Sequence, residues 1–219
     1  MYVTCSTLCY GRTTLDNALK SIAELQFGKY DLSISEKSKH IRPSEITGDL
    51  NGTVNRLRNG QGLTPAAFNL DLNHTPADES ANSFKSVLKL ARITNVSQVT
   101  ISASPSDCEL STEIERLDQL NRLAVMDAVQ LNIATETGTL TEDPDKAFYL
   151  CEKVPGLGLT LDPTTYTIGP FAGKNHDHLF PYVRHVQLRD TGIKPDQYQV
   201  RIGQGQIDYW RIIGLLEKY

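Results

Sequence analysis

Two carboxylates stand at the ends of apolar segments, where they could move a proton or bind a cation. In residues 157 to 162 three leucines share one face of a predicted strand, so the alternation of side chains turns Asp162 to the other face. In residues 129 to 135 the same alternation places Glu136, just past the end, opposite a leucine and an isoleucine. Carboxylates act as general bases and as oxygen ligands of divalent cations. Glu136 and Asp162 are therefore candidates for catalysis and for metal binding.

A third segment, residues 183 to 188, adds groups that can donate hydrogen bonds. Its valine and leucine predict a face toward covering helices, which leaves His185, Gln187 and Arg189 on the opposite face. We expect His185 to be either a catalytic base or a hydrogen-bonded histidine of the core. Gln187 is a candidate for binding substrate or, weakly, a metal. Asp190, at the start of the next loop, either binds substrate or accepts hydrogen bonds from the backbone or Arg189.

The three segments belong to a regular alternation of strands and helices with short connections, which predicts parallel strands covered by helices. The predicted strands are residues 2–6, 30–35, 63–69, 98–103, 129–135, 157–162 and 183–188. The predicted helices begin at Thr14, run from Pro43 through Leu57, span 83–94 and 111–126, begin at Asp143, and span 207–216. Seven strand-helix units are one fewer than close a typical barrel of about 250 residues. We expect a barrel shortened at its C-terminal end; a seven-stranded barrel and closure by another chain are the alternatives.

Three motifs of the last third carry a resemblance to a known family. They are LGLTLDP at residues 157–163, RHVQLRD at 184–190 and GQGQID at 203–208. In this order and spacing they resemble the xylose isomerase-like TIM barrels, a superfamily of sugar isomerases and epimerases that also includes endonuclease IV. The resemblance is specific from about Gly138 to Trp210. It implies an α/β fold, a (β/α)8-type TIM barrel incomplete at the C-terminus, as a single domain over residues 1–219.

The same resemblance implies a divalent metal on four ligands at the tips of late strands. Only Asp162 matches its ligand position unchanged. At the position of the family's glutamate in the fifth strand this sequence has Ala134, and at the position of a family histidine it has Glu136. Thr165 replaces the histidine of the Asp-Pro-x-His motif, and Gln187 replaces the ligand histidine of the seventh strand. The fourth ligand, a glutamate of strand eight, has no counterpart. One carboxylate does not hold Mg²⁺ or Mn²⁺, which prefer several oxygen ligands.

Two interpretations of this rim follow. In one, Glu136, Gln187 and Glu36, at the end of the second strand, join Asp162 in a rebuilt site for Mn²⁺, Mg²⁺ or Co²⁺. In the other, the rim is a hydrogen-bonded polar cluster without metal. Lys174 is a candidate partner for a sugar phosphate or carboxylate, or a surface lysine.

Two further groups of residues have metal-binding chemistry, and each has a simpler interpretation. His176 and His178 could form a metal tract or the solvated start of a helix. The cysteines, Cys5, Cys9, Cys108 and Cys151, match neither a zinc site nor a thioredoxin-type pair, so we expect reduced thiols.

Composition excludes some classes of function. The net charge of -4, from 22 Lys and Arg against 26 Asp and Glu, argues against a surface that binds a phosphate backbone. The first residues lack the basic segment and apolar core of a signal peptide, and no apolar run approaches a membrane span. We therefore expect a cytoplasmic protein that binds neither nucleic acid nor membrane.

The resemblance implies a sugar or sugar-phosphate isomerase or epimerase that moves a proton between adjacent carbons. The alternative is a non-catalytic barrel that has lost its metal site and binds a sugar-like ligand or a protein partner. A homodimer could cover the open edge of the sheet. Phosphodiester cleavage like that of endonuclease IV needs a histidine-rich zinc site, against which Thr165 and Gln187 argue.

Overall fold

The computed structural model describes residues 2–75, 77–193, 197 and 199–219, which fall into two compact units. Unit 1 consists of Met1–Ile101 and Arg122–Leu131, and unit 2 of Ser102–Asn121 and Asn132–Tyr219. The prediction of one domain over residues 1–219 stays a prediction. In both units the strands are parallel and follow one another in the sheet in sequence order, as expected from the alternation of strands and helices.

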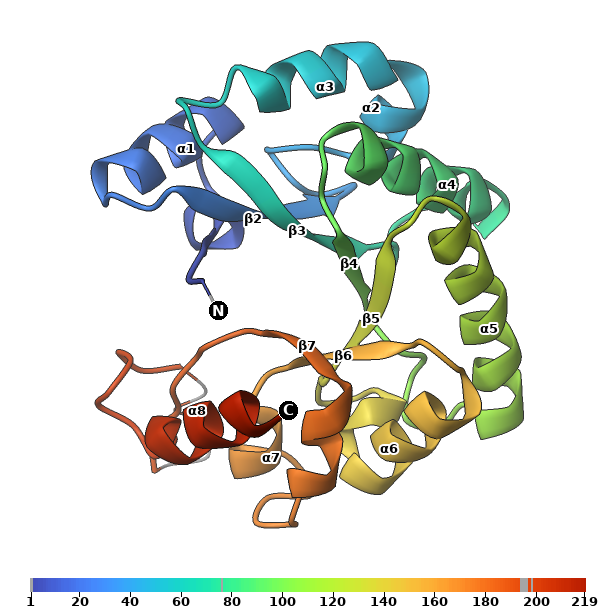
Figure 1. Cartoon of the computed structure of the whole chain (residues 1–219), viewed down its shortest axis with the longest axis vertical. Coiled ribbons are helices and arrows are strands. Elements are labelled where there is room, and N and C mark those ends of the chain that lie inside the picture. The colour runs from blue at the N-terminus through green and yellow to red at the C-terminus, as the bar shows by residue number, and fades with distance from the viewer. Residues whose placement is uncertain (1, 76, 194–196, 198) are drawn as a thin grey trace. The chain divides into compact units, whose positions relative to one another are not determined.

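Unit 1 is a parallel sheet with helices along it (Figure 1). Its strands are β1 (Cys5–Ser6), β2 (Lys29–Ser35), β3 (Thr64–Asp71) and β4 (Gln98–Ile101). Its helical elements are η1 (Thr7–Tyr10), α1 (Leu15–Glu24), α2 (Pro43–Gly48), α3 (Leu50–Arg58) and α4 (Ala77–Ile93). Two elements have residues in both units, α5 (Leu110–Met126) and β5 (Gln130–Ala134).

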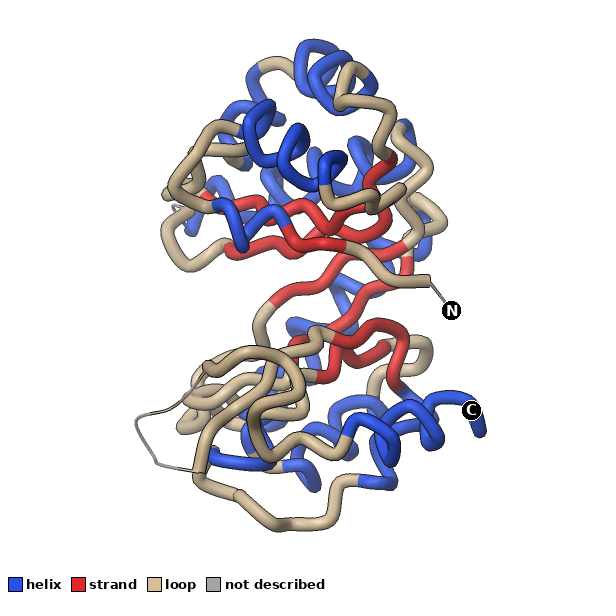
Figure 2. Tube along the Cα trace, turned by 90° about the vertical axis from the view of Figure 1, so that its left-hand side faces the viewer, coloured by secondary structure: helices blue, strands red, loops and turns tan. Residues whose placement is uncertain are grey.

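The core of unit 1 lies between one face of the sheet and these helices (Figure 2). Tyr30, Leu32 and Ile34 alternate along β2 and are fully buried, because the period of two brings them to one face. Leu15 and Ile22 of α1 are buried as well. Thr14 caps α1, its hydroxyl accepting from the Asn17 amide, as the sequence predicts.

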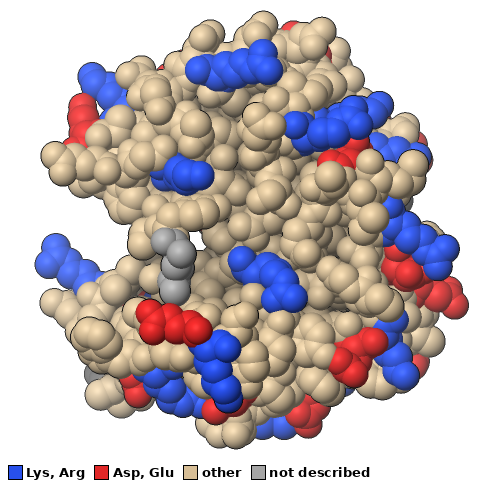
Figure 3. Space-filling model, viewed as in Figure 1, with Lys and Arg blue, Asp and Glu red and all other residues tan. Residues whose placement is uncertain are grey.

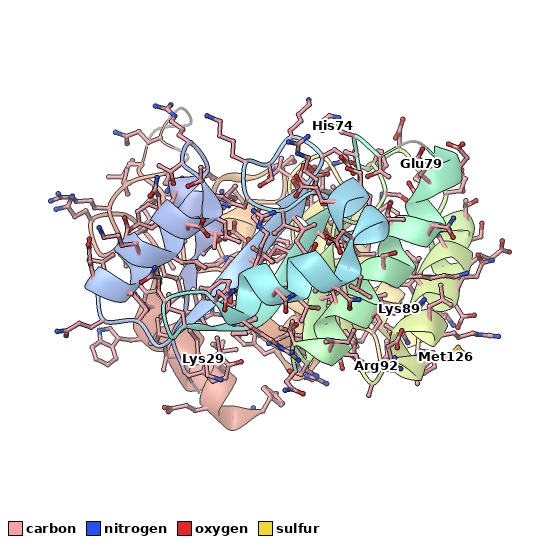
Figure 4. All side chains as sticks on the ribbon, turned by 90° about the horizontal axis from the view of Figure 1, so that it is seen from above. Lys29, His74, Glu79, Lys89, Arg92 and Met126 are labelled. Atoms are coloured by element: carbon pink, nitrogen blue, oxygen red, sulfur yellow. The ribbon has the colours of Figure 1, made fainter. Side chains whose placement is uncertain are left out.

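The direction of the strands in unit 1 can be followed in Figure 4. Lys29, the first residue of β2, lies at one edge of the unit, and His74, just after the end of β3, lies at the opposite edge. The carboxyl ends of parallel strands therefore meet at the edge of His74. Glu36, which follows β2, belongs to this edge.

The predicted single helix from Pro43 through Leu57 is wrong, because the chain forms two helices there. Asp49 leaves the helical conformation, with φ -146° and ψ 80°, and its carboxylate accepts from the Gly52 amide at 2.8 Å. An aspartate that caps a new helix ends the preceding one, which a count of apolar spacings does not reveal.

Unit 2 holds the remaining elements. They are η2 (Leu140–Glu142), α6 (Pro144–Lys153), β6 (Gly158–Leu161), α7 (Thr165–Ile168), η3 (Asp177–Tyr182), β7 (Val183–Val186) and α8 (Tyr209–Lys218). Every residue of β6 is buried, as in a strand covered on both faces. Asp143 caps α6 as predicted, and Asp208 caps α8. In the described part of the chain β7 is the last strand, so the expected absence of an eighth strand agrees with the structure.

On the surface that Figure 3 presents, Lys and Arg side chains and Asp and Glu side chains are scattered, with no large patch of one charge. Among the helices of the described residues, none is both long and apolar enough to cross a membrane. Cys5, Cys9, Cys108 and Cys151 are free thiols, as expected.

Candidate functional site

Three strand ends of unit 2 bring most of the predicted site residues to one edge. Ala134 of β5 pairs with Thr160 of β6, and Thr160 pairs with His185 of β7. The Gln187 amide then donates to the Leu161 carbonyl at 2.9 Å. Since the carboxyl ends of parallel strands share an edge, Glu136, Asp162 and Gln187 follow neighbouring strands at corresponding positions.

Asp162 is buried, and each oxygen of its carboxylate accepts two hydrogen bonds. Its Oδ2 accepts from the guanidinium of Arg189, from Nε at 2.6 Å and from Nη2. Its Oδ1 accepts from Thr164, from the amide at 2.9 Å and from the hydroxyl at 2.6 Å. The side chain of Asp162 is only 4% exposed, whereas that of Arg189 is 50% exposed. Asp162 is therefore a neutralised carboxylate, and Arg189 supplies a cation whose outer side faces solvent.

The backbone of Asp162 is fixed as firmly as its side chain. The Thr135 hydroxyl accepts from the Asp162 amide at 2.8 Å and lies 3.3 Å from the Asp162 carbonyl. Thr165, at the position of the family histidine, donates its hydroxyl to the Thr135 carbonyl at 3.0 Å. Tyr166 donates to the carbonyl of Thr141 at 2.8 Å. The LDPTTY run thus joins the ends of β5 and β6 through hydroxyl groups.

Glu136 is the accessible carboxylate of this edge. It lies two residues beyond β5, is exposed, and accepts from the Ser102 hydroxyl at 2.9 Å. Its amide donates to the Thr141 hydroxyl at 3.2 Å, which holds the turn that follows the strand. The carboxylate can therefore reach a ligand in solvent.

Asp190 is buried in the loop after β7, where it accepts four backbone N–H groups. Its Oδ1 accepts from Thr191 at 2.9 Å and Ile207 at 3.2 Å, and its Oδ2 accepts from Gly203 at 2.8 Å and Gly205 at 2.9 Å. Burial acts to raise the pKa of Asp190, but the four backbone donors together hold it below its ordinary value. The interpretation of Asp190 as an acceptor of backbone hydrogen bonds is confirmed, and the GQGQID motif is the loop that surrounds it.

Lys174 is held by two carboxylates of α6. Its Nζ lies 2.7 Å from Oδ1 of Asp143 and 2.9 Å from Oδ2 of Asp145. The hydrogen bonds to Asp143 and then to Asp145 raise the pKa of Lys174 above its ordinary value. The ammonium group thus has negative partners within the protein itself.

The remaining predicted residues lie as follows. Glu36 belongs to unit 1, where its two carboxylate oxygens accept from the amide and the hydroxyl of Ser44, both at 2.8 Å, at the start of α2. His185 is half-buried within β7, and Gln187 is half-buried just after it.

His176 and His178 lie at the start of η3, but they are half-buried, so the predicted solvated helix start is correct only in its position. The His176 ring packs on Tyr166, with centroids 4.9 Å apart, and burial lowers the pKa of His176. The His178 ring meets Phe148 edge to face at 5.3 Å. Both histidines thus contribute packing to unit 2.

Solved structures that match the chain share its fold at low sequence identity. The probable 3-DHS dehydratase AsbF involved in the petrobactin synthesis from Bacillus anthracis matches with a TM-score of 0.76 at 14% identity, over 100% of this chain and 89% of its own. A xylose isomerase-like TIM barrel protein from Mycobacterium smegmatis, in complex with magnesium, matches with a TM-score of 0.77 at 14% identity, over 100% and 88%. A D-tagatose 3-epimerase-like protein matches with a TM-score of 0.75 at 14% identity, over 100% and 86%.

The chain has the xylose isomerase-like TIM barrel fold. This confirms the predicted fold class. No family model and no curated protein matches the sequence.

The site residues of this xylose isomerase-like chain do not fit a divalent metal. Among the described residues no group of three or more His, Cys, Asp or Glu side chains is arranged to hold an ion. Asp162, which the resemblance predicted to be a metal ligand, already accepts four hydrogen bonds, two of them from a guanidinium. A metal ion would have to displace the charge of Arg189.

Arg189 lies on the side of Asp162, as the alternation of residues 183–188 predicts, whereas the hydroxyl residues were not predicted. Thr135, Thr164 and Ser102 position Asp162 and Glu136. Their signal in the sequence is weak, because threonine and serine are frequent at strand ends and turns for purely local reasons.

Proposed function

We propose that the chain is a sugar-modifying enzyme of the isomerase or epimerase kind, whose site works without a divalent metal ion. The observation that carries the proposal is the pair of Asp162 and Arg189 at the ends of β6 and β7. It puts a fixed guanidinium at the strand ends where the resemblance implies a metal. The fold of epimerase-like and dehydratase neighbours supports the class of substrate.

The accessible groups of the edge match the needs of proton transfer. Glu136 offers an exposed carboxylate, and Arg189 keeps half of its side chain in solvent. A carboxylate can take a proton from the carbon next to a sugar carbonyl, while a guanidinium donates to the oxygen on which negative charge develops.

The reaction needs no oxidant or second substrate. Glu136 removes the proton of the carbon that bears a hydroxyl group, and the electron pair moves into an enediolate. Return of the proton from Glu136 to the neighbouring carbon, with transfer of the hydroxyl proton between the two oxygens, isomerises the sugar. Inversion needs a second acid that protonates the opposite face of the same carbon, after which Glu136 loses its proton to water. Arg189 stabilises the enediolate oxygen, and His185 stays a candidate for carrying the second proton.

The proposal is tested by exchange of carbon-bound hydrogen for deuterium. The full chain, treated with EDTA, is incubated in D₂O with D-tagatose, D-fructose or D-xylose, and loss of the proton signal beside the carbonyl is followed by NMR. We expect exchange, and we expect Glu136→Gln to slow it by about a hundredfold or more, the usual scale of a general base. The matched control is Glu115→Gln, which changes an exposed glutamate of α5 in the same unit.

A second measurement concerns the metal. Thermal unfolding is recorded with and without millimolar Mn²⁺, Mg²⁺ or Co²⁺. An ion that binds the folded state must raise the unfolding temperature, so a site that binds no metal should show no shift. A clear stabilisation that disappears in Asp162→Ala would contradict the metal-independent site.

A non-catalytic sugar-binding protein is the second candidate. The complete engagement of Asp162 favours it, because a carboxylate held by four donors cannot itself move a proton. Sugar binding by wild type without any deuterium exchange would select this function. A cytoplasmic location and a homodimer stay predictions from the sequence.

A further inference from the structure

We propose that the ligand of this site is a neutral, unphosphorylated sugar. The inference rests on the proposed function and adds the substrate class. It comes from the way two cations near the ends of β5 and β6, Lys174 and Arg189, are paired with carboxylates of unit 2.

Lys174 is the residue whose chemistry best suits a phosphate, but its ammonium group is paired with two carboxylates of the protein. Asp143 and Asp145 both lie within 3 Å of its ammonium nitrogen, at 2.7 and 2.9 Å. Asp143 is also the cap of α6, accepting from the Asp145 amide at 3.1 Å, so this carboxylate is fixed in place. A phosphate that approached Lys174 would meet two negative charges beside one positive charge.

Arg189 is neutralised in the same way. Two of its nitrogens donate to one oxygen of Asp162, which is buried and cannot turn away into water. The pair has no net charge, yet the exposed edge of the guanidinium still donates hydrogen bonds. Donors of this kind suit hydroxyl and carbonyl oxygens, whereas phosphate recognition relies on uncompensated cations.

The surrounding loops are acidic. In the segments that follow β5, β6 and β7 before the next main helix or strand, residues 135–143, 162–182 and 187–208, the described residues include seven carboxylates and three cations. The carboxylates are Glu136, Glu142, Asp143, Asp162, Asp177, Asp190 and Asp208, and the cations are Lys174, Arg189 and Arg201. Asp177 is paired with Arg211 of α8, so six carboxylates face three cations when this pair is set aside. Lys194 and Asp196, outside the described residues, are of opposite charge and leave this difference unchanged. A dianionic phosphate is disfavoured in such surroundings because like charges brought together at an interface oppose binding.

The test compares matched sugars that differ only in the phosphate. Affinities of the full chain for D-fructose and D-fructose 6-phosphate, and for D-glucose and D-glucose 6-phosphate, are measured by NMR titration at low and high salt. We expect the neutral member of a pair to bind about tenfold more tightly at low salt. The difference should shrink as salt rises, because screening acts on the charged ligand alone.

A designed variant asks whether the pairing of Lys174 sets this preference. Asp143→Asn with Asp145→Asn releases the lysine and keeps an asparagine, which caps helices as well as aspartate does. We expect this variant to bind the sugar phosphates several-fold more tightly than wild type. The control, Asp16→Asn with Glu24→Gln, removes two exposed acids from α1 of unit 1 and changes the net charge equally.

The outcomes separate the two proposals. Tighter binding of the phosphorylated sugars by wild type overturns the neutral substrate class and leaves the proposed function standing. Failure of every sugar, neutral or phosphorylated, to bind overturns the proposed function and this inference with it. An equal response of the α1 control and the Asp143, Asp145 variant assigns the effect to net charge and overturns the role of Lys174.

Discussion

Two buried aspartates of unit 2, Asp162 after β6 and Asp190 after β7, have their carboxylate charge stabilised by different kinds of hydrogen-bond donor. Asp162 accepts from a guanidinium and from one threonine, whereas Asp190 accepts only backbone N–H groups from a loop of its own segment. Both have relative exposures of 3% or less.

The difference teaches which carboxylate belongs to a ligand site. The partner of Asp162 is a side chain that is half exposed, so it can exchange hydrogen bonds with a ligand. The partners of Asp190 are amides fixed by the course of the loop, and a ligand could displace them only by opening it. Asp190 is therefore a structural residue, and Asp162 with Arg189 forms the chemically accessible pair.

The largest effect in this comparison is expected for Asp190→Ala. The substitution leaves four amide donors without their acceptor, and we expect the free energy of unfolding to fall by about 3 to 4 kcal/mol. Urea unfolding measures it, with Asp107→Asn, an exposed residue of the same unit, as the control that should stay within about 0.5 kcal/mol of wild type. A loss below about 1 kcal/mol would contradict the structural role of Asp190.

The same residue predicts a dependence on pH. The pKa of Asp190 is lower in the folded chain than its ordinary value, so its contribution is complete above about pH 4 and is lost as pH falls through the folded pKa. Unfolding of wild type and Asp190→Asn at several pH values should therefore show a difference in stability that shrinks below about pH 4. A constant difference from pH 6 to pH 3 would refute the assignment.

An intermediate effect is expected for Gly205→Ala. An added Cβ would stand 2.1 Å from Oδ1 of Asp190 and 2.4 Å from the Thr191 carbonyl oxygen, closer than atoms can approach. We expect a loss of about 2 to 3 kcal/mol, because the loop must move away from the carboxylate. Gly203→Ala, where φ is +83° and no atom lies within 4 Å of the new Cβ, is the matched control and should cost only about 1 kcal/mol. Equal losses for the two variants would show that close packing on Asp190 is not required.

The smallest loss of stability is expected for Arg189→Ala. Removing one partner of a fully buried ion pair costs roughly 3 to 5 kcal/mol, and the half-exposed arginine reduces this to about 2 kcal/mol. The double variant Asp162→Asn, Arg189→Ala should recover part of it, since no buried charge is then left alone, and Asp162→Asn is the second single variant of the cycle. Urea unfolding of the four proteins gives the coupling energy between Asp162 and Arg189. A value near zero would show that the ion pair does not stabilise the folded chain.

Much of the fold follows from local patterns. The caps Thr14 and Asp143 marked the starts of α1 and α6, because capping acts within a few residues. The predicted strand over residues 2–6 is wrong at its start, since β1 is Cys5–Ser6. The helix predicted over 83–94 begins at Ala77 instead, because its first turns are polar and carry no apolar period. The break at Asp49 was missed, since a capping aspartate inside an apolar period of 3.6 looks like an ordinary surface position. The predicted strand over residues 183–188 ends at Val186, where the backbone leaves the ladder although the apolar alternation continues.

The neighbourhood of some predicted side chains followed from the sequence, but their contacts did not. Alternation along the strands correctly put Asp162 and Arg189 near the same edge, and the motif correctly pointed to Asp190. Neither the alternation nor the motif revealed that Lys174 would bind Asp143, thirty-one residues earlier in the chain. Pairing of this kind depends on which loops meet, and many arrangements of exposed charges are nearly equal in energy.

The sequence by itself determined the order of strands and helices and the faces of each strand. These properties depend on residue type and spacing alone. Only the tertiary structure decided that a guanidinium twenty-seven residues away neutralises Asp162 and that four amides enclose Asp190. The reason is that a buried carboxylate must be satisfied by whichever donors the packed strand ends and loops bring within hydrogen-bonding distance.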